Sequence, residues 1–305
     1  MSAYGPAFDT IARELLLNLE LHCNGHVLRV LECEFYWRAD EPAGTAVPDG
    51  GHHHDLFAHA SPVQHSNYGR WYWHRQGTKP DASYKGGNYK GLDVTCGPVG
   101  GTGHGGILIR SVQRVSDGVC IEGSCLVADE VLRLHKATSI AEVVARWNGN
   151  TCAFSNPTLF FARAKHRLPS PKSGAPMIVR SPRVGLTLKQ AGATRPRFIM
   201  LPYRYCRVDV PGFVNKKQKQ TLLLSAYEEL GAGAEAKQLI QKMCGATAGY
   251  FAQHVAAFEA GKKLKGMDKF VAAKAGAGSA EELSQMYGAW MKEFGGKHVA
   301  FIRAD

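Results

Sequence analysis

The 305-residue sequence predicts an α+β protein in which a strand-rich portion precedes a helical extension. Before Phe213, short segments show the alternation of apolar and polar residues that is typical of half-buried strands. After Phe213, the composition shifts to Ala, Lys, Glu and Gln, with apolar residues at helical spacing. We therefore place a boundary near Asn215 and expect one domain at residues 1–214 and a helical extension at residues 215–305.

The chain opens with a helix and a hairpin. Apolar residues at helical spacing follow Asp9, which is placed to cap the helix. Asn24-Gly25 supplies the positive φ angles of a tight hairpin turn. The segments predicted here are a helix at Asp9–Leu17, strands at Leu17–Leu21 and Val27–Tyr36, and a long loop at Asp40–Pro62. A loop of that length inside a compact domain is usually functional.

Further elements follow from the same patterns. The strands predicted next are Arg70–His74, Leu92–Cys96, Gly106–Arg110, Ile178–Leu188 and Arg197–Leu201, with Pro196 at a tolerated start position. The predicted helices are Asp129–His135, Ser139–Trp147, Lys216–Leu230, Ala234–Phe258 and Ala280–Phe294. Ser139 and Glu142 have the spacing of a capping box. Arg110 ends an apolar strand, where a buried guanidinium needs a carboxylate partner.

The strand that ends at Tyr36 carries the most informative pattern. Alternation places Glu32, Glu34 and Tyr36 on one face, and Leu31, Cys33 and Phe35 on the other. A carboxylate on a mostly apolar strand costs free energy unless it contacts water, has an ion-pair or hydrogen-bonding partner, or takes part in the function of the protein. The sequence therefore predicts that Glu34 is the main functional residue of the protein. An edge strand whose acids face solvent would give the same pattern.

Composition limits the class of protein. No apolar run is long enough to span a bilayer, and the first residues lack the pattern of a signal peptide, so we expect an intracellular protein without membrane partners, cytoplasmic in a bacterium and nuclear in a eukaryote. The eight cysteines are scattered, and we expect reduced thiols. The formal charge of +11 suits a polyanionic partner, with nucleic acid ahead of a membrane surface.

Several basic residues stand beside aromatic ones. The segments concerned are Gly69–Arg75, Tyr84-Lys85, Asn88–Lys90 and Tyr203–Tyr205. Cations between rings suit contact with phosphates together with stacking on bases, although aromatic residues also favour ordinary sheet surfaces. His52, His53, His54, Asp55 and His59 invite a metal site. Consecutive residues rarely converge on one ion, so we expect no metal and no cofactor.

Motifs in consistent order give this chain a resemblance to a known family. They are Ala12–Leu16, Asn24-Gly25, Arg29–Tyr36, Asp55–His59, Gly87–Val94, Ile107–Arg110, Ser181–Gly185 and Thr194–Phe198. In this order they resemble the alkyladenine (3-methyladenine) DNA glycosylases over about residues 11–205. The resemblance implies a mixed domain with a curved antiparallel sheet, which binds double-stranded DNA and flips a modified nucleotide into a pocket. The residues after Asn215 lie outside it.

The resemblance also implies site residues. Glu34 matches the family's catalytic base, which would activate water for hydrolysis of the N-glycosidic bond. Tyr36 and His59 match the residues that sandwich the flipped base, and Arg110 matches a supporting arginine. From their type and position, we expect Arg70, Arg75, Lys85, Lys90 and Arg183 to contact DNA. Lys85 and Lys90 could instead form a Schiff base with the sugar, but we expect phosphate contact and a monofunctional, monomeric enzyme.

Two departures from the family bear on the substrate. Asp93 replaces the family's pocket asparagine, where it would act as a second acid or raise the proton affinity of Glu34. The alternative for both acids is a structural pairing with Arg110 or Lys90. The preceding segment is polar, and we expect its Asn88 to bind the substrate. Either Tyr84 or Tyr89 is expected to fill the space of the flipped nucleotide. We therefore expect a bulkier or more polar base than 3-methyladenine, such as a hypermodified pyrimidine removed in phage defence. A non-catalytic reader of modified bases is the alternative from another class.

Overall fold

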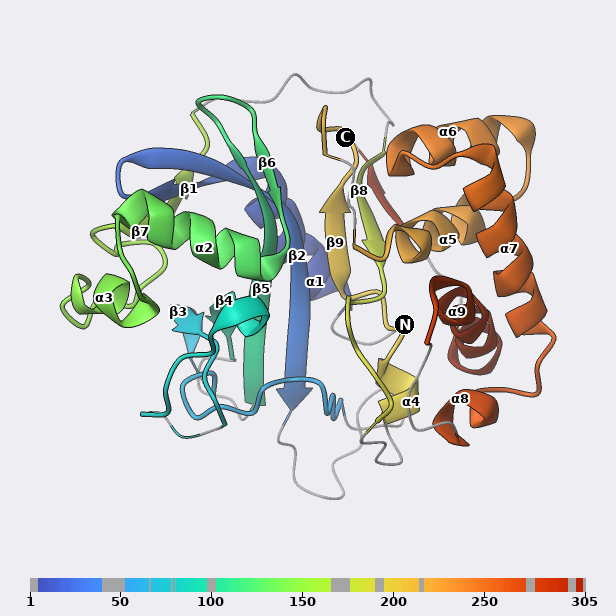
Figure 1. The fold of residues 1–305 in the computed structure, drawn as a ribbon, viewed down its shortest axis with the longest axis horizontal. Helices are drawn as coiled ribbons and strands as arrows, with labels where there is room; N and C mark the ends of the chain where they lie inside the picture. The colour runs from blue at the N-terminus through green and yellow to red at the C-terminus, as the bar shows by residue number, and fades with distance from the viewer. Residues whose placement is uncertain are drawn as a thin grey trace. The chain divides into compact units, whose positions relative to one another are not determined.

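The computed structural model describes residues 5–39, 53–65, 67–77, 79, 81–97, 103–165, 176–189, 195–213, 217–272, 278–295 and 300–303. Strands and helices occur in both parts of the chain, and the strand pairs are antiparallel, so the α+β prediction is confirmed (Figure 1). The chain divides into two compact units, Ser2–Pro169 and Ser170–Asp305.

The N-terminal unit contains an open sheet flanked by helices. Its strands are β1 (Leu19–Cys23), β2 (His26–Ala39), β3 (Tyr68–Trp73), β4 (Leu92–Cys96), β5 (Gly103–Arg114), β6 (Cys120–Glu122) and β7 (Leu159–Arg163). Its helices are α1 (Gly5–Arg13), the π-helix η1 (Glu14–Asn18), the 3-10 helix η2 (Gly87–Tyr89), α2 (Ser124–His135) and α3 (Ile140–Ala145). The sheet order is β2-β5-β4-β3, with β6 beside β5, and β1 between β2 and β7.

The predicted hairpin turn is confirmed, but its first strand is Leu19–Cys23 and not Leu17–Leu21. Asn24 and Gly25 have φ angles of 45° and 82°, and Cys23 pairs with His26 across the turn.

Ser139 caps α3 and accepts a hydrogen bond from the Glu142 amide, as predicted. The cap predicted at Asp9 is wrong, because α1 already begins at Gly5. The sequence could not locate this start, since α1 has no acidic residue in its first turn.

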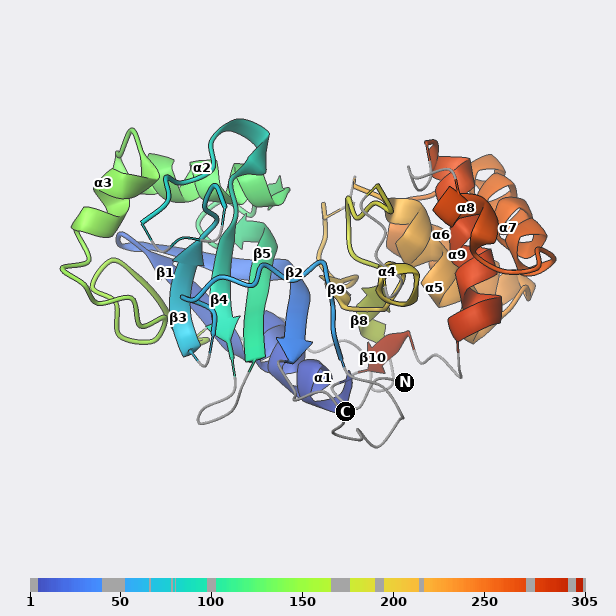
Figure 2. The same ribbon diagram turned by 90° about the horizontal axis from the view of Figure 1, so that it is seen from below.

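Helices cover both faces of this sheet. Phe8 of α1 stacks on Phe35 of β2, with ring centroids 4.5 Å apart. Helix α2 lies on the opposite side of the sheet from α1 (Figures 1 and 2). Gln64, in the segment 53–65, contacts the same sheet through the carboxylate of Asp93. The sheet therefore has an apolar face under α1 and a face with polar contacts.

The C-terminal unit combines a small antiparallel sheet, ordered β10-β8-β9, with packed helices. Its elements are β8 (Pro176–Ser181), α4 (Arg195–Phe198), β9 (Arg204–Arg207), α5 (Lys219–Leu230), α6 (Ala234–Cys244), α7 (Ala248–Lys262), α8 (Asp268–Ala272), α9 (Ala280–Phe294) and β10 (Phe301–Arg303). Helix α9 has the predicted bounds. The strand predicted at Arg197–Leu201 is wrong, because this segment begins in helix α4. Pro196 lies in the first turn of α4, where a missing N–H costs no helical hydrogen bond.

Glycines allow α7 and α9 to cross closely. A Cβ on Gly288 of α9 would overlap the Phe258 carbonyl oxygen of α7, and a Cβ on Gly261 of α7 would overlap the Gln285 carbonyl oxygen of α9. Neither helix can carry a side chain at its glycine without moving the other helix. The glycines therefore fix where these helices touch.

The helices after residue 215 belong to the same compact unit as β8 and β9. Glu229 of α5 accepts a hydrogen bond from the Phe301 amide at 2.9 Å and pairs with Arg303, and β10 in turn pairs with β8. The sequence instead predicted that the first domain continues to residue 214. That boundary stays a prediction, and truncation before Lys216 tests it.

Candidate active site

Strand register sorts the side chains of the N-terminal sheet into two faces. Directly opposed residues of neighbouring strands have side chains on the same face. One row across β2, β5, β4 and β3 is Glu34, Leu108, Asp93 and Tyr72. The neighbouring row on the other face is Phe35, Ile107, Val94 and Trp71. Both candidate acids therefore belong to the face opposite Phe35, as predicted for Glu34.

Glu34 is fully buried, with 0% of its surface exposed. The Tyr36 hydroxyl donates a hydrogen bond of 2.8 Å to its Oε2 atom. Nε of Arg110, from β5, lies 3.4 Å from its Oε1 atom. Contacts at both oxygens fix the plane of the carboxylate, which is the geometry that a positioned general base requires.

Arg110 connects Glu34 to a second buried acid. Its Nε atom donates a hydrogen bond of 3.1 Å to Glu32, which also accepts a hydrogen bond of 2.5 Å from the Ser111 hydroxyl. Burial alone would lower the pKa of Arg110, but the carboxylates of Glu34 and Glu32 raise it above its ordinary value. The prediction that buried Arg110 has a carboxylate partner is confirmed. The guanidinium stays charged and holds two acids from one strand.

Asp93 has partners of its own. Gln64 Nε2 donates a hydrogen bond of 3.0 Å to Oδ2, and His74 Nε2 lies 2.9 Å from Oδ1. Leu108 separates Asp93 from Glu34 in the row, so the two backbones are about 10 Å apart at ordinary strand spacing. Asp93 pairs with His74, whereas the sequence had offered Arg110 or Lys90 as the structural partner. The face thus carries two separate clusters. One consists of Glu34, Glu32 and Arg110, and the other, the Asp93 cluster, consists of Asp93, Gln64 and His74.

His59 extends the Asp93 cluster. Its ring centroid lies 4.9 Å from that of His74. Burial, with smaller effects of His74 and Lys85, lowers the pKa of His59 to about 4, against an opposing effect of Asp93. His59 is therefore a neutral imidazole at pH 7, which can accept a proton. Its predicted place beside a flipped base stays a prediction.

The sequence missed Gln64 and His74 as members of this site. His74 lies just beyond β3, two residues after Tyr72, which is opposite Asp93. A period of two would have put His74 on the Asp93 face, but only with the register of β3 and β4 known. Gln64 lies in the segment 53–65, just beyond the predicted loop Asp40–Pro62, where no repeating pattern predicts contacts.

The predicted substrate-binding residues between β3 and β4 have different environments. Tyr84 is half-buried beneath Arg75, whose guanidinium lies 4.2 Å from the ring centroid. Asn88 and Tyr89 lie in the exposed helix η2, and Tyr89 is 78% exposed. Of the two tyrosines proposed to fill the space of a flipped nucleotide, Tyr89 is the accessible one.

The predicted DNA-binding residues also differ. Arg70 is exposed, Arg75 and Lys85 are half-buried, and Lys90 forms an ion pair with Asp129 of α2. Arg183, in the C-terminal unit, is 2% exposed, and its guanidinium lies 5.5 Å from the Tyr203 ring centroid. Contact of Arg183 with phosphate would require this side chain to become exposed. The buried position therefore does not favour that assignment, which stays a prediction.

We expect Gly106→Ala to disrupt the Asp93 cluster. A Cβ at Gly106 would lie 2.5 Å from Gln64 Nε2 and 2.7 Å from Asp93 Oδ2. The substitution should lower the free energy of unfolding by about 1–3 kcal/mol, measured by urea denaturation. In a Gln64→Ala background the same change should cost less, because the clashing amide is gone. Gly5→Ala is the control, since a Cβ there meets nothing within 4 Å. Equal effects in both backgrounds would contradict the assigned contact.

Three further features concern metal ions, membranes and the cysteines. No group of three or more His, Cys, Asp or Glu side chains among the described residues is placed to hold a metal ion, and His52 lies outside those residues. None of the helices in the described ranges has both the length and the apolar character to cross a membrane. The eight cysteines are free thiols, as predicted.

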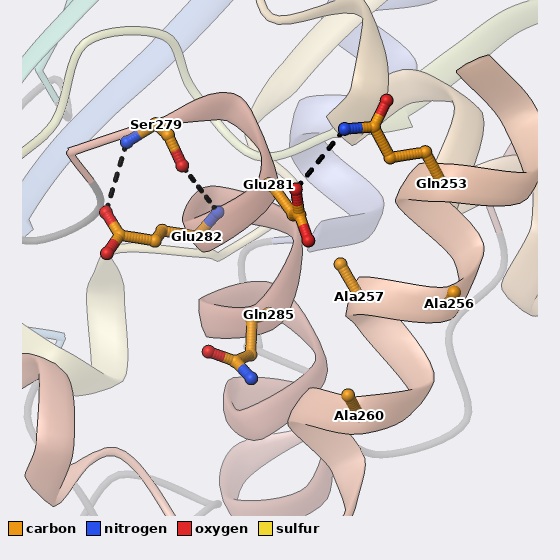
Figure 3. A pocket seen from close by; sticks show the side chains of 8 residues that line it. All are labelled: Gln253, Ala256, Ala257, Ala260, Ser279, Glu281, Glu282 and Gln285. Atoms are coloured by element: carbon orange, nitrogen blue, oxygen red, sulfur yellow. Dashed lines mark hydrogen bonds between the residues drawn. The ribbon is translucent and has the colours of Figure 1, made fainter. Parts of the chain in front are cut away.

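A groove lies between α7 and α9 (Figure 3). Its lining residues are Gln253, Ala256, Ala257, Ala260, Ser279, Glu281, Glu282 and Gln285. Glu282 completes the capping box of α9 with Ser279, and Gln253 donates a hydrogen bond of 3.2 Å to Glu281. These polar groups have structural partners, so we assign the groove no part in the chemistry.

Comparisons with known proteins identify a relative by sequence. No family model matches the chain. The chain is 30% identical over 209 residues to a protein of Acanthamoeba polyphaga mimivirus, "Uncharacterized protein L759". The alignment covers 65% of this chain and 84% of the mimivirus protein.

Proposed function

We propose that this chain, which belongs to the same family as the mimivirus protein L759, is a DNA glycosylase that hydrolyses the N-glycosidic bond of a flipped, modified nucleotide. The observation that carries the proposal is the fixed carboxylate of Glu34. It is fully buried and contacts Tyr36 and Arg110, on the strand whose motif resembles the alkyladenine DNA glycosylases.

In this proposal Glu34, Arg110 and Tyr36 have different roles in the reaction. As the base departs, positive charge develops on the sugar, and an oriented carboxylate stabilises it while accepting a proton from the attacking water. Glu34 takes that role. Arg110 lies at ion-pair distance from the neighbouring carboxylates, and the Tyr36 hydroxyl holds one Glu34 oxygen. In this proposal Arg110 and Tyr36 position the base.

The Asp93 cluster favours a polar substrate base. Asp93, Gln64 and His74 are hydrogen-bonding groups on the same face of the sheet as Glu34. A site that hydrogen-bonds its substrate rejects analogues that leave its polar groups without partners. We therefore propose a base richer in polar groups than 3-methyladenine, such as a hydroxylated or glycosylated pyrimidine in foreign DNA.

Release of free base from modified DNA tests the proposal. The protein is incubated with duplexes that carry alkylated purines, hypoxanthine, or hydroxylated and glycosylated pyrimidines, and the free base is quantified by mass spectrometry. We expect release from the polar pyrimidines. Release of 3-methyladenine or hypoxanthine alone would contradict the polar-substrate proposal. Binding without release from any duplex would favour the non-catalytic reader, which the complete burial of Glu34 also permits.

Binding to DNA should depend strongly on salt. With a formal charge of +11, contacts to phosphates should dominate affinity, so the dissociation constant should rise about 10²-fold or more between about 50 and 200 mM salt. Fluorescence anisotropy with an unmodified duplex measures this. Arg70→Ala should lower the salt slope by about one, because Arg70 is exposed. A flat salt dependence would show that phosphates are not the partner.

A further inference from the structure

The lysines on either side of η2 have different surroundings. Lys90 forms an ion pair with Asp129 of α2. Lys85 is half-buried, and within the described part of the chain its ammonium has no hydrogen-bonding partner. Its charge lies within electrostatic range of Asp93 and His59. The sequence treated the two lysines alike, but the structure separates them.

Backbone pairing directs Lys85 toward the Asp93 cluster. The segment after β3 pairs with the segment before η2 through an Arg75–Tyr84 bridge. The Lys85 amide donates a hydrogen bond of 2.9 Å to the His74 carbonyl oxygen, so Lys85 lies opposite His74. Opposed residues in an antiparallel pair have side chains on the same side. Lys85 therefore lies on the side where His74 meets Asp93 and His59.

Burial makes proton loss from the Lys85 ammonium easier than from an exposed lysine. Burial lowers the pKa of Lys85, and the opposing effect of Asp93 does not cancel this. A lysine whose pKa is lowered by desolvation has more of the neutral form that attacks carbonyl groups. His59, with its pKa lowered to about 4, is a neutral base beside it. The cluster thus combines a candidate nucleophile with a candidate proton acceptor.

We propose that Lys85 is an amine nucleophile that forms a Schiff base with the aldehyde of an abasic deoxyribose and so gives the protein a DNA lyase activity. This inference rests on the proposed function, because glycosidic hydrolysis generates that aldehyde. The substrate class is an abasic site in DNA.

Each step of the reaction balances without an oxidant or reductant. The Lys85 Nζ lone pair adds to C1′ of the open sugar, the carbonyl oxygen takes a proton, and loss of water leaves a protonated imine. His59 then accepts a proton from C2′, the electron pair of that C–H bond forms a C2′–C3′ double bond, and the C3′–O bond breaks with its electrons on the departing phosphate. Water hydrolyses the imine, which regenerates the amine and leaves a nicked strand.

Reductive trapping on preformed abasic DNA tests this inference. The full chain is incubated with a duplex that contains one abasic site and sodium cyanoborohydride, and the covalent protein–DNA product is quantified on a denaturing gel. We expect trapping by the unaltered protein and at least about a tenfold loss in Lys85→Arg, which keeps the charge but cannot form the imine. Lys79→Arg, at an exposed position of the same segment, should trap normally.

The controls separate this inference from the proposed glycosylase function. Thermal melting and DNA affinity of Lys85→Arg are measured in parallel and trapping is compared at saturating protein, so that a change in folding or binding is distinguished from loss of the amine. Undiminished trapping by Lys85→Arg would overturn the assignment of Lys85. Absence of trapping by a protein that releases free base would overturn the lyase inference alone. If the protein is trapped on abasic DNA but releases no base from any duplex, the assignment of Lys85 as an amine nucleophile would be supported and the proposed glycosylase function would be contradicted.

Discussion

Glu34→Gln should lower the rate of base release by about 10²–10⁴-fold, because the substitution keeps the size of the side chain but removes the proton acceptor. Glu34 is fully buried and held by the Tyr36 hydroxyl and Arg110, so the amide would occupy the same place. Single-turnover measurement of free base gives the rate of the chemical step. DNA affinity should be kept, because no phosphate contact is assigned to Glu34.

Two further variants make this experiment specific. Tyr36→Phe removes the hydroxyl that fixes one oxygen of Glu34 and should cause a smaller loss than Glu34→Gln. Glu235→Gln changes an exposed glutamate in the first turn of α6 and should leave base release unchanged. Melting temperatures should accompany each rate, because loss of one partner of a buried ion pair is destabilising. Near-normal turnover in a folded Glu34→Gln protein would remove Glu34 from the mechanism.

Gly288→Ala should have the largest effect on stability. A Cβ there would overlap the Phe258 carbonyl oxygen, which belongs to the backbone of α7 and cannot rotate away. The helices would have to separate, so we expect a loss of about 3 kcal/mol or more in the free energy of unfolding. Denaturant unfolding followed by circular dichroism measures the loss.

Gly249→Ala is the matched control for this variant. Gly249 lies in α7, and a Cβ there would meet nothing within 4 Å. Alanine has the higher helix propensity by up to about 1 kcal/mol, so this change should be neutral or stabilising. If Gly288→Ala were equally well tolerated, the close crossing of α7 and α9 would be wrong.

The elements that local chemistry specifies were predictable. The turn at Asn24 and Gly25, the cap at Ser139 and the bounds of α9 each depend on neighbouring residues, and each is confirmed. The single helix predicted at Ala234–Phe258 is instead α6 and α7, because Gly245 adopts a left-handed conformation between them. The sequence showed this glycine but not its φ angle.

The candidate site was predictable only in part. The face of Glu34 and the need of Arg110 for an acid followed from a period of two and from the energetics of buried charge. The pairing of Asp93 with His74 depends on the register between β3 and β4, which sequence periodicity does not give. The contact from Gln64 depends on a segment without regular structure. Tertiary geometry, and not residue type, decided these partners.

The ion pairs of Arg110 also limit how the family can diverge. Arg110 comes from β5, whereas Glu32 and Glu34 come from β2, far apart in the sequence. Loss of both acids would leave the guanidinium buried without a carboxylate partner and would destabilise the folded protein by about 3–5 kcal/mol. Relatives that replace both acids should therefore also replace the arginine, and relatives that keep the arginine should keep at least one acid. The three positions should covary, whether or not a given relative is an enzyme.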